Sequence, residues 1–232
     1  MGDSRLWVSD RILKWGREAR ALARQGQLII HGRGRAALPV RGERVVVFVH
    51  GFMAAGPVFD PMRRFVEERV QGVGTIDLTY GPFEDFEHVV ERLERTVRSA
   101  SEGRPVDLVG HSLGGIVARW YLQERGGAEH VDRLVTLASP HAGTETARLN
   151  IGPLLRAIHP DGQVIRRLRE NRERAARVKH TVVVAGADQF VTPPESAATI
   201  EDAVVHWLDD LSHGELLFDL RVFEHVCEGL RR

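Results

Sequence analysis

The sequence of 232 residues has one cysteine, no net charge and no long hydrophobic run. The single Cys227 excludes an intramolecular disulfide and a cysteine-based zinc site. The 32 basic residues balance 32 acidic ones, which argues against a nucleic-acid-binding protein because such proteins carry a basic surplus. No run of about 18 apolar residues is present to span a membrane. Residues 1–10 also lack the charged-then-apolar layout of a secretory signal, so we expect a cytoplasmic protein.

The composition is that of a globular protein with an uneven charge distribution. With 43% apolar and 28% charged residues, the chain has enough apolar side chains for a sizeable core. Its length suits one large domain or two small ones. Residues 1–42 contain nine basic and three acidic side chains, a net charge of +6, so the remainder carries −6. Such a split marks the basic segment as a candidate for a partner of its own.

The basic segment shows a helical pattern of apolar residues. They recur every three or four positions and are Val8, Ile12, Trp15, Ala19 and Leu22. This spacing predicts an amphipathic helix over residues 6–23. Gly26, Gly32, Gly34 and Pro39 then break regular structure, with a short strand predicted at 28–31. We expect residues 1–42 to be a basic helix and connector, which either docks on the rest of the protein or lies on an anionic membrane surface as a peripheral contact.

Beyond residue 42, strand and helix patterns alternate. β-branched and apolar runs predict strands at 45–49, 73–78, 106–109, 134–138, 181–185 and 203–208. Helical patterns lie at 58–70, 83–100, 113–124 and 216–228. This alternation predicts an α/β fold, a doubly wound domain with a mostly parallel central sheet flanked by helices, over residues 43–232.

A serine lies in a glycine-rich turn between a predicted strand and a predicted helix. Residues 110–114 read Gly-His-Ser-Leu-Gly, which fits the G-x-S-x-G motif of serine hydrolases. Gly110 and Gly114 lack the side chains that would collide in so sharp a turn. Ser112 is therefore the candidate nucleophile, held at the C-terminal edge of the sheet above a helix N-terminus that favours negative charge.

A second loop is expected to help stabilise the oxyanion that forms when a carbonyl is attacked. His50-Gly51-Phe52-Met53 follows the strongest strand run, and Gly51 permits a turn that aims the Phe52 N–H at the site. The matching donor is the N–H of Leu113, directly after the nucleophile. Phe52 and Leu113 are thus the expected oxyanion-hole residues.

These motifs resemble three consecutive motifs of bacterial lipases and esterases of the α/β-hydrolase fold. The matching segments are Val47-Phe48-Val49-His50-Gly51-Phe52, Gly110-His111-Ser112-Leu113-Gly114-Gly115 and Thr136-Leu137-Ala138-Ser139-Pro140-His141-Ala142-Gly143-Thr144. The resemblance runs over residues 44–226 and implies an α/β-hydrolase fold with serine-ester chemistry. It does not specify a substrate.

The acid and the base must follow the serine in that order along the chain. Asp188 comes directly after the strand run at 182–185 and resembles the family's acid; Glu195 and Asp202 are rivals that lie further from a strand end. His213, in Ser212-His213-Gly214-Glu215-Leu216, resembles the family's terminal histidine and would exchange the proton with the serine. His206 is its nearest rival but sits inside an apolar run, and the resemblance implies structural roles for His50, His111 and His141.

Residues 140–179 form a long insertion between two strands. An insertion of this length holds more than one helix and is often functional. The family commonly places a cap or lid here, at about residues 141–178. Leu154, Leu155 and Ile158, next to Ile151, would then cover an acyl chain, or they simply pack on the body. An Arg-rich helical run at 164–178 follows them.

The expected activity is hydrolysis of carboxylic esters with apolar acyl chains by a lipase or carboxylesterase. Met53 and Phe59 would join Phe52 and Leu113 in an apolar acyl pocket. An acyltransferase or thioesterase using the same three residues is the alternative, and a non-catalytic binding module is a further one. The sequence shows no set of metal ligands and no phosphate loop, so we expect no metal and no cofactor, and a small-molecule or lipid ester as substrate.

Overall fold

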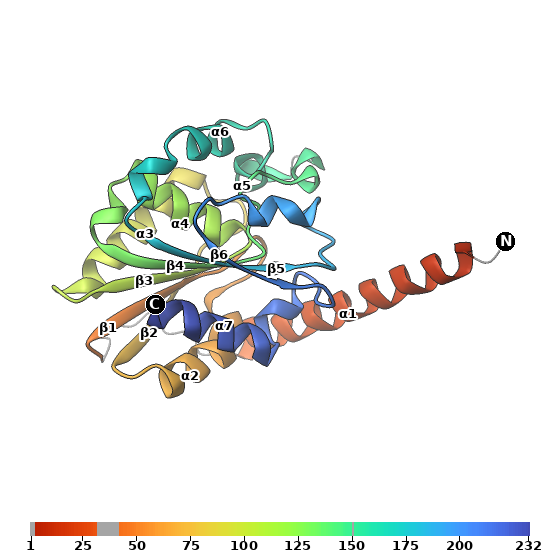
Figure 1. The fold of residues 1–232 in the computed structure, drawn as a ribbon, viewed down its shortest axis with the longest axis horizontal. Helices are drawn as coiled ribbons and strands as arrows, with labels where there is room; N and C mark the ends of the chain where they lie inside the picture. Colours follow the sequence, from red (N-terminus) through yellow and green to blue (C-terminus); the bar gives the residue numbers. More distant parts are fainter. Residues whose placement is uncertain (1–2, 32–41, 150) are drawn as a thin grey trace.

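The computed structural model describes residues 3–31, 42–149 and 151–232, with side chains from Trp15 onward. The described residues form one six-stranded sheet in the order β2-β1-β3-β4-β5-β6 (Figure 1). All neighbouring strands are parallel, which confirms the predicted α/β fold. The strands are β1 Arg44–Val49, β2 Val73–Leu78, β3 Val106–His111, β4 Val131–Leu137, β5 Lys179–Ala185 and β6 Val204–Leu208.

The register of the central strands brings three loops to one edge of the sheet. Val49 at the end of β1 pairs with Gly110 of β3. His111 at the end of β3 pairs with Leu137 at the end of β4. Because the strands are parallel, the segments that follow β1, β3 and β4 all leave the sheet at this C-terminal edge, where α/β proteins bind their ligands.

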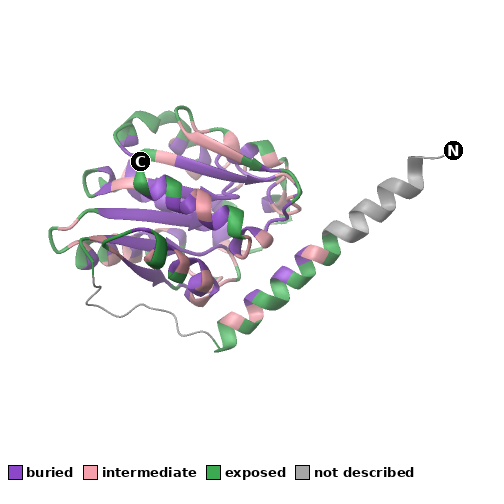
Figure 2. Ribbon diagram, turned by 60° about the horizontal axis from the view of Figure 1, so that its bottom comes forward, coloured by how far each residue is buried: buried purple, intermediate pink, exposed green. Residues whose placement is uncertain are grey.

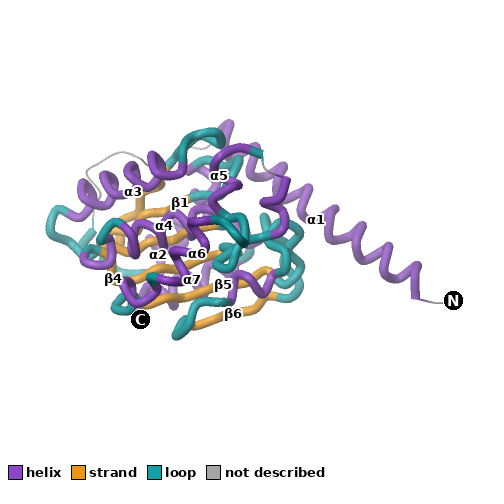
Figure 3. Tube along the Cα trace, turned by 90° about the horizontal axis from the view of Figure 1, so that it is seen from above, coloured by secondary structure: helices purple, strands orange, loops and turns teal. Residues whose placement is uncertain are grey.

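Helices cover both faces of the sheet, as Figures 1 and 3 show. One face carries α3 Phe86–Ser101, α4 Leu113–Glu124, α5 Gly152–Ala157 and α6 Gln163–Glu170, and the other carries α2 Asp60–Arg69 and α7 Leu220–Arg231. Most residues of β1 to β5 are buried, whereas the edge strand β6 is only partly buried (Figure 2). In β4, for example, Leu134 packs in one apolar cluster and Val135 in the other. This two-sided burial explains the continuous apolar runs in the sequence.

The N-terminal helix differs from its prediction in length and in the face that it buries. α1 extends over Asp3–His31, so the short strand predicted at 28–31 is wrong; the backbone continues in a helix because a glycine inside one, here Gly26, costs only about 1 kcal/mol. The predicted apolar residues Trp15 and Leu22 are 50% and 46% exposed. The side chains of Val8 and Ile12 lie outside the described residues, as do the breakers predicted at 32, 34 and 39.

The long insertion consists of several short helices that pack on the body. Two 3₁₀ segments, Glu145–Leu149 and Arg172–Ala175, flank α5 and α6, which confirms more than one helix. The Arg-rich helix ends at Glu170 rather than continuing to 178, and the Asn171 amide donates to Glu124. No helix among the described residues is long and apolar enough to cross a membrane.

Candidate active site

Ser112 occupies a strained turn between β3 and α4. Its backbone has φ 54° and ψ −124°, a conformation that a residue with a side chain rarely adopts and that is typical of functional sites. Two hydrogen bonds hold the turn: the Ser112 N–H donates to the Leu137 carbonyl at 2.8 Å, and the Gly115 N–H donates to the Ser112 carbonyl at 3.1 Å. The strand–turn–helix setting inferred from the sequence is therefore present.

The glycines of the motif allow a very close approach of the turn to β1. A Cβ on Gly114 would collide with the Val49 carbonyl oxygen, and a Cβ on Gly110 would lie 2.6 Å from the Gly115 nitrogen. Real Cβ atoms do not approach backbone so closely. The turn can form only with hydrogen at both positions.

The loop after β1 lies directly against the serine. A Cβ on Gly51 would come within 3.0 Å of the Ser112 Cβ. The His50 ring holds this loop, since Nδ1 lies 2.7 Å from the Gly51 carbonyl oxygen and Nε2 accepts from the Tyr80 N–H at 3.2 Å. Burial lowers the pKa of His50 to about 4, so the ring is neutral at pH 7 and Nδ1 donates to Gly51. Among the described residues, the N–H groups of Phe52 and Leu113 have no protein acceptor.

Asp188 follows β5 and is held by its own turn. Its Oδ1 accepts from the N–H groups of Phe190 and Val191 at 2.7 and 2.8 Å. Its Oδ2 accepts from His213 Nδ1 at 2.8 Å. The carboxylate side chain is 1% exposed. Asp188 can thus orient the His213 ring while its remaining acceptor capacity is filled by backbone.

The electrostatic surroundings of His213 favour its charged form. Burial alone would lower the pKa of His213, but the charge and hydrogen bond of Asp188 and the more distant charge of Glu18 raise it above its ordinary value. The neighbouring His111 is different, because burial holds its pKa well below the usual range. The His111 ring lies 4.7 Å from that of His213, and its Nε2 lies 3.2 Å from the His213 carbonyl oxygen. The residue before Ser112 therefore packs directly on His213.

The sequence did not reveal that Glu18 contacts the loop of His213. This residue of α1 is fully buried, and its carboxylate accepts from the N–H of Gly214, the residue after His213, at 3.0 and 3.2 Å. Ala21 and Gln25 pack against the same glycine. The helical spacing of positions 18, 21 and 25 was the available signal, but a face with two polar residues does not stand out in an apolar pattern.

The residues predicted to line an acyl pocket lie in several environments. Met53 is 64% exposed, whereas Phe59 is fully buried against Phe48, with ring centroids 5.1 Å apart. Leu154, Leu155 and Ile158 are buried in the core cluster on the opposite face of the sheet. The structure does not bring Phe59 together with these three, so their shared role in substrate binding stays a prediction.

The rival residues have other surroundings. Glu195 is exposed in a 3₁₀ segment, and Asp202 lines a cavity formed by residues other than Ser112, Asp188 and His213. His206 stacks on His225 with ring centroids 3.9 Å apart. Together with Glu228 these two histidines place candidate metal-ligand atoms within 4.8 Å of one another, the one such group among the described residues.

Comparison with known proteins places this site in a family. A family model described as palmitoyl protein thioesterase matches residues 45–186, more than half of the chain. The chain belongs to the palmitoyl protein thioesterase family. That match spans the loop after β1, the Ser112 turn and the strand that leads to Asp188. Family membership and fold support a hydrolase of the lipase or thioesterase type.

Solved structures confirm the α/β-hydrolase fold of this family member. Bacillus licheniformis lipase BlEst2 in mature form aligns with a TM-score of 0.66 and 18% identity, over 84% of this chain and 96% of that chain. Aspergillus fumigatus lipase B gives 0.69 and 17%, over 82% and 53%. A monoacylglycerol lipase from Paleococcus ferrophilus gives 0.57 and 17%, over 80% and 91%. A search of curated proteins gave no match.

The contact of Glu18 with the His213 loop generates a test of the role of α1. In Glu18→Gln the amide oxygen still accepts from Gly214, but the negative charge that raises the pKa of His213 is lost. We expect the pKa of His213 to fall, measured by NMR titration of its ring protons. Glu195→Gln, which removes an exposed carboxylate, is the control and should leave the titration unchanged. An unchanged His213 titration in Glu18→Gln would contradict this electrostatic role.

Proposed function

We propose that this protein is a serine hydrolase that cleaves esters of apolar acyl chains through Ser112, Asp188 and His213. The hydrogen bond between Asp188 and His213, beside the strained turn of Ser112, carries the proposal. A nucleophile, an orienting acid and a base, in this chain order, are the requirements of acyl transfer on an α/β-hydrolase sheet.

In the proposed mechanism each group has one task. His213 keeps its Nδ1 proton on Asp188, so Nε2 is the base that takes the proton of Ser112 as its oxygen attacks the acyl carbonyl. The N–H groups of Phe52 and Leu113 receive the oxyanion, with the N-terminus of α4 adding a favourable dipole. His213 then returns the proton to the departing alcohol or thiol. Water activated by the same ring attacks the acyl-enzyme and releases the carboxylic acid.

Thioester cleavage is the second candidate, and the family match favours it. The same steps apply to a thioester, with a thiol in place of the alcohol as leaving group. Exposed apolar side chains beside the start of α5 suit either substrate class: Phe83 is 70% exposed and would lie 3.4 Å from a Cβ on Gly152, and Ile151 is 51% exposed.

We propose further that α1 contacts an anionic lipid surface. Trp15, Leu22 and Ile29, spaced seven residues apart, are 50%, 46% and 39% exposed, and the basic side chains of Arg20 and Arg24 on the same helix are exposed too. An exposed apolar row on a basic helix is the pattern of interfacial helices. The Trp15 ring lies 6.4 Å from Phe190, whose ring lies 5.4 Å from that of His213, so this row begins close to the base.

Substitution of the nucleophile tests the central proposal. We expect Ser112→Ala to lower kcat for p-nitrophenyl ester hydrolysis by about a thousandfold or more, because the acyl-enzyme can no longer form. Ser101→Ala, at the end of α3, should keep the activity of the unaltered protein. Undiminished turnover by folded Ser112→Ala would refute the role of this serine.

Matched substrates separate the two candidate leaving groups and test acyl preference. Oxygen esters and thioesters with the same acyl chain, from acetyl to palmitoyl, are compared by kcat/KM. We expect kcat/KM to rise with chain length by up to about fourfold per buried methylene, since each stabilises the complex by about 0.8 kcal/mol. A flat profile would contradict an apolar acyl site, and a preference for one series at equal chain length identifies the substrate class.

Vesicle binding tests the role assigned to α1. The double variant Trp15→Ala/Leu22→Ala should bind anionic vesicles at least about tenfold more weakly than the unaltered protein in co-sedimentation, because buried aromatic and aliphatic area drives interfacial binding. Leu220→Ala removes a leucine of α7 that is 64% exposed, more than Leu22, and serves as the control. Equal vesicle binding by all three proteins would leave α1 without a membrane role.

A further inference from the structure

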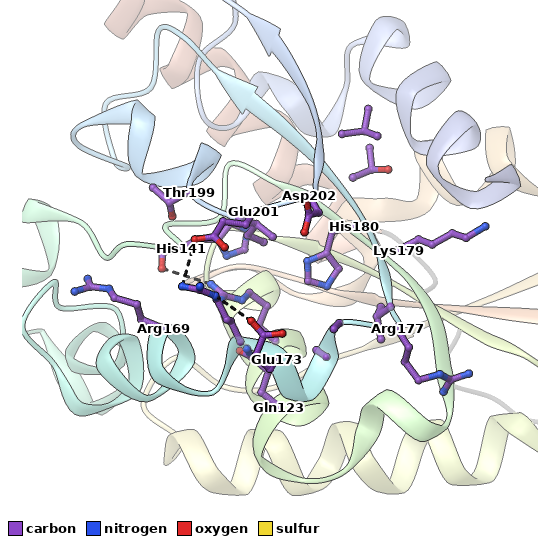
Figure 4. A pocket seen from close by; sticks show the side chains of 18 of the residues that line it. Gln123, His141, Arg169, Glu173, Arg177, Lys179, His180, Thr199, Glu201 and Asp202 are labelled. Atoms are coloured by element: carbon purple, nitrogen blue, oxygen red, sulfur yellow. Dashed lines mark hydrogen bonds and ion pairs between the residues drawn. The ribbon is translucent and has the colours of Figure 1, made fainter.

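A cavity of about 800 Å³ lies outside the proposed catalytic residues (Figure 4). Its walls come from α4, α6, the 3₁₀ segment Arg172–Ala175, the start of β5 and the loop before β6. Ser112, Asp188 and His213 are not among the residues that line it. A volume of this size is in the range that holds a small organic molecule.

The wall of this cavity contains a buried arginine with no acidic partner. Arg119, on α4, is 7% exposed, and its guanidinium donates to the carbonyls of Leu168 at 3.1 Å and His141 at 3.5 Å. Its Nε has no partner among the described residues, and no carboxylate of the described chain pairs with it. Burial lowers the pKa of Arg119 to about 10, so the side chain remains charged at pH 7. An unpaired buried charge is costly, which marks it as a binding group for an anion.

Two neutral histidines lie close to this charge. His141 is 4% exposed, and its Nε2 lies 3.0 Å from the Thr136 hydroxyl, which can donate to it and so leave the proton on Nδ1. That Nδ1 has no partner among the described residues, and neither has His180 Nε2. Burial, with the nearby charge of Arg119, holds the pKa of His141 well below its usual range and lowers that of His180 to about 3. Both rings are therefore neutral and can each offer one N–H.

Two of the three acidic side chains that line the cavity pair with an arginine at its rim, and the third, Asp202, is exposed. Arg172, which is 53% exposed, pairs with Glu173 at 3.4 Å and with Glu201 at 3.2 Å. Figure 4 shows Glu201 and Asp202 on the side of the cavity opposite Glu173, while His180 points from β5 toward the middle. The interior charge of Arg119 is thus not neutralised by the rim.

We propose that this cavity binds the phosphate group of a small molecule, with Arg119 as its counter-charge and His141 and His180 as hydrogen-bond donors. A guanidinium binds phosphate with strong charge-assisted hydrogen bonds, and a tetrahedral phosphate accepts from several directions at once. The cavity volume greatly exceeds that of a phosphate ion, so the remaining space suits the organic part of a phosphomonoester.

The test is calorimetric titration of the full chain at constant ionic strength with two probes, inorganic phosphate and adenosine 5′-monophosphate, with chloride as the reference anion. We expect saturable binding of the monoester. Arg119→Gln should weaken it by at least about tenfold, as lost hydrogen bonds to a charged group do, and Arg119→Lys should restore part of the affinity. Arg98→Gln, which removes an exposed charge on α3, should bind as the unaltered protein does.

Thermal unfolding without phosphate distinguishes binding from structure. Because Arg119 donates to the Leu168 and His141 carbonyls, Arg119→Gln should unfold at a somewhat lower temperature without phosphate while staying folded at the temperature of the titration, and phosphate should no longer raise its unfolding temperature. His180→Leu, on β5, is the second variant, and its affinity for the monoester should fall as well. Binding of inorganic phosphate without binding of adenosine 5′-monophosphate would contradict the proposal that the ligand has an organic part. Absence of binding of both probes, or unchanged affinity in folded Arg119→Gln and His180→Leu, would overturn the site.

Discussion

The contact between the serine turn and the end of β1 is the constraint on which the site depends. Gly114 approaches the Val49 carbonyl so closely that no side chain fits between them, and Gly51 lies close enough to Ser112 that a Cβ would come to 3.0 Å from the Ser112 Cβ. These contacts place the loop after β1 beside Ser112, the proposed nucleophile. They also hold Ser112 at a positive φ, a strain that the hydrogen bonds to Leu137 and Gly115 offset.

Burial separates the histidines of this protein into two kinds. The pKa values of His50, His111, His141 and His180 are lowered because their rings are surrounded by protein without a carboxylate partner. His213 is equally enclosed, yet its pKa is raised because Asp188 and Glu18 are close. The one buried histidine with a raised pKa is the one proposed to carry the proton between Ser112 and the leaving group.

The N-terminal helix links the site to the surface. Its buried side bears Glu18, Ala21 and Gln25, which pack on the loop of His213, and its exposed side bears the apolar row that includes Trp15 and Leu22. Docking on the body and the proposed contact with a lipid surface therefore concern different faces of this helix. The docking is observed, and the lipid contact is proposed.

The local sequence determined the strands and the turn at Ser112, because these depend on residues that are neighbours in the chain. The β-branched runs predicted buried parallel strands, and the glycines at 110 and 114 predicted a tight strand-to-helix turn around Ser112. The α/β fold and the candidate Ser112, Asp188 and His213 therefore followed from the sequence and its family resemblance. Which side of α1 is buried, the carboxylate of Glu18 on Gly214 and the unpaired charge of Arg119 in a cavity were decided only by the tertiary structure. Each of these features joins residues that are far apart in the chain. Their energies depend on burial and on which charges lie nearby in the fold, and a local sequence pattern shows neither.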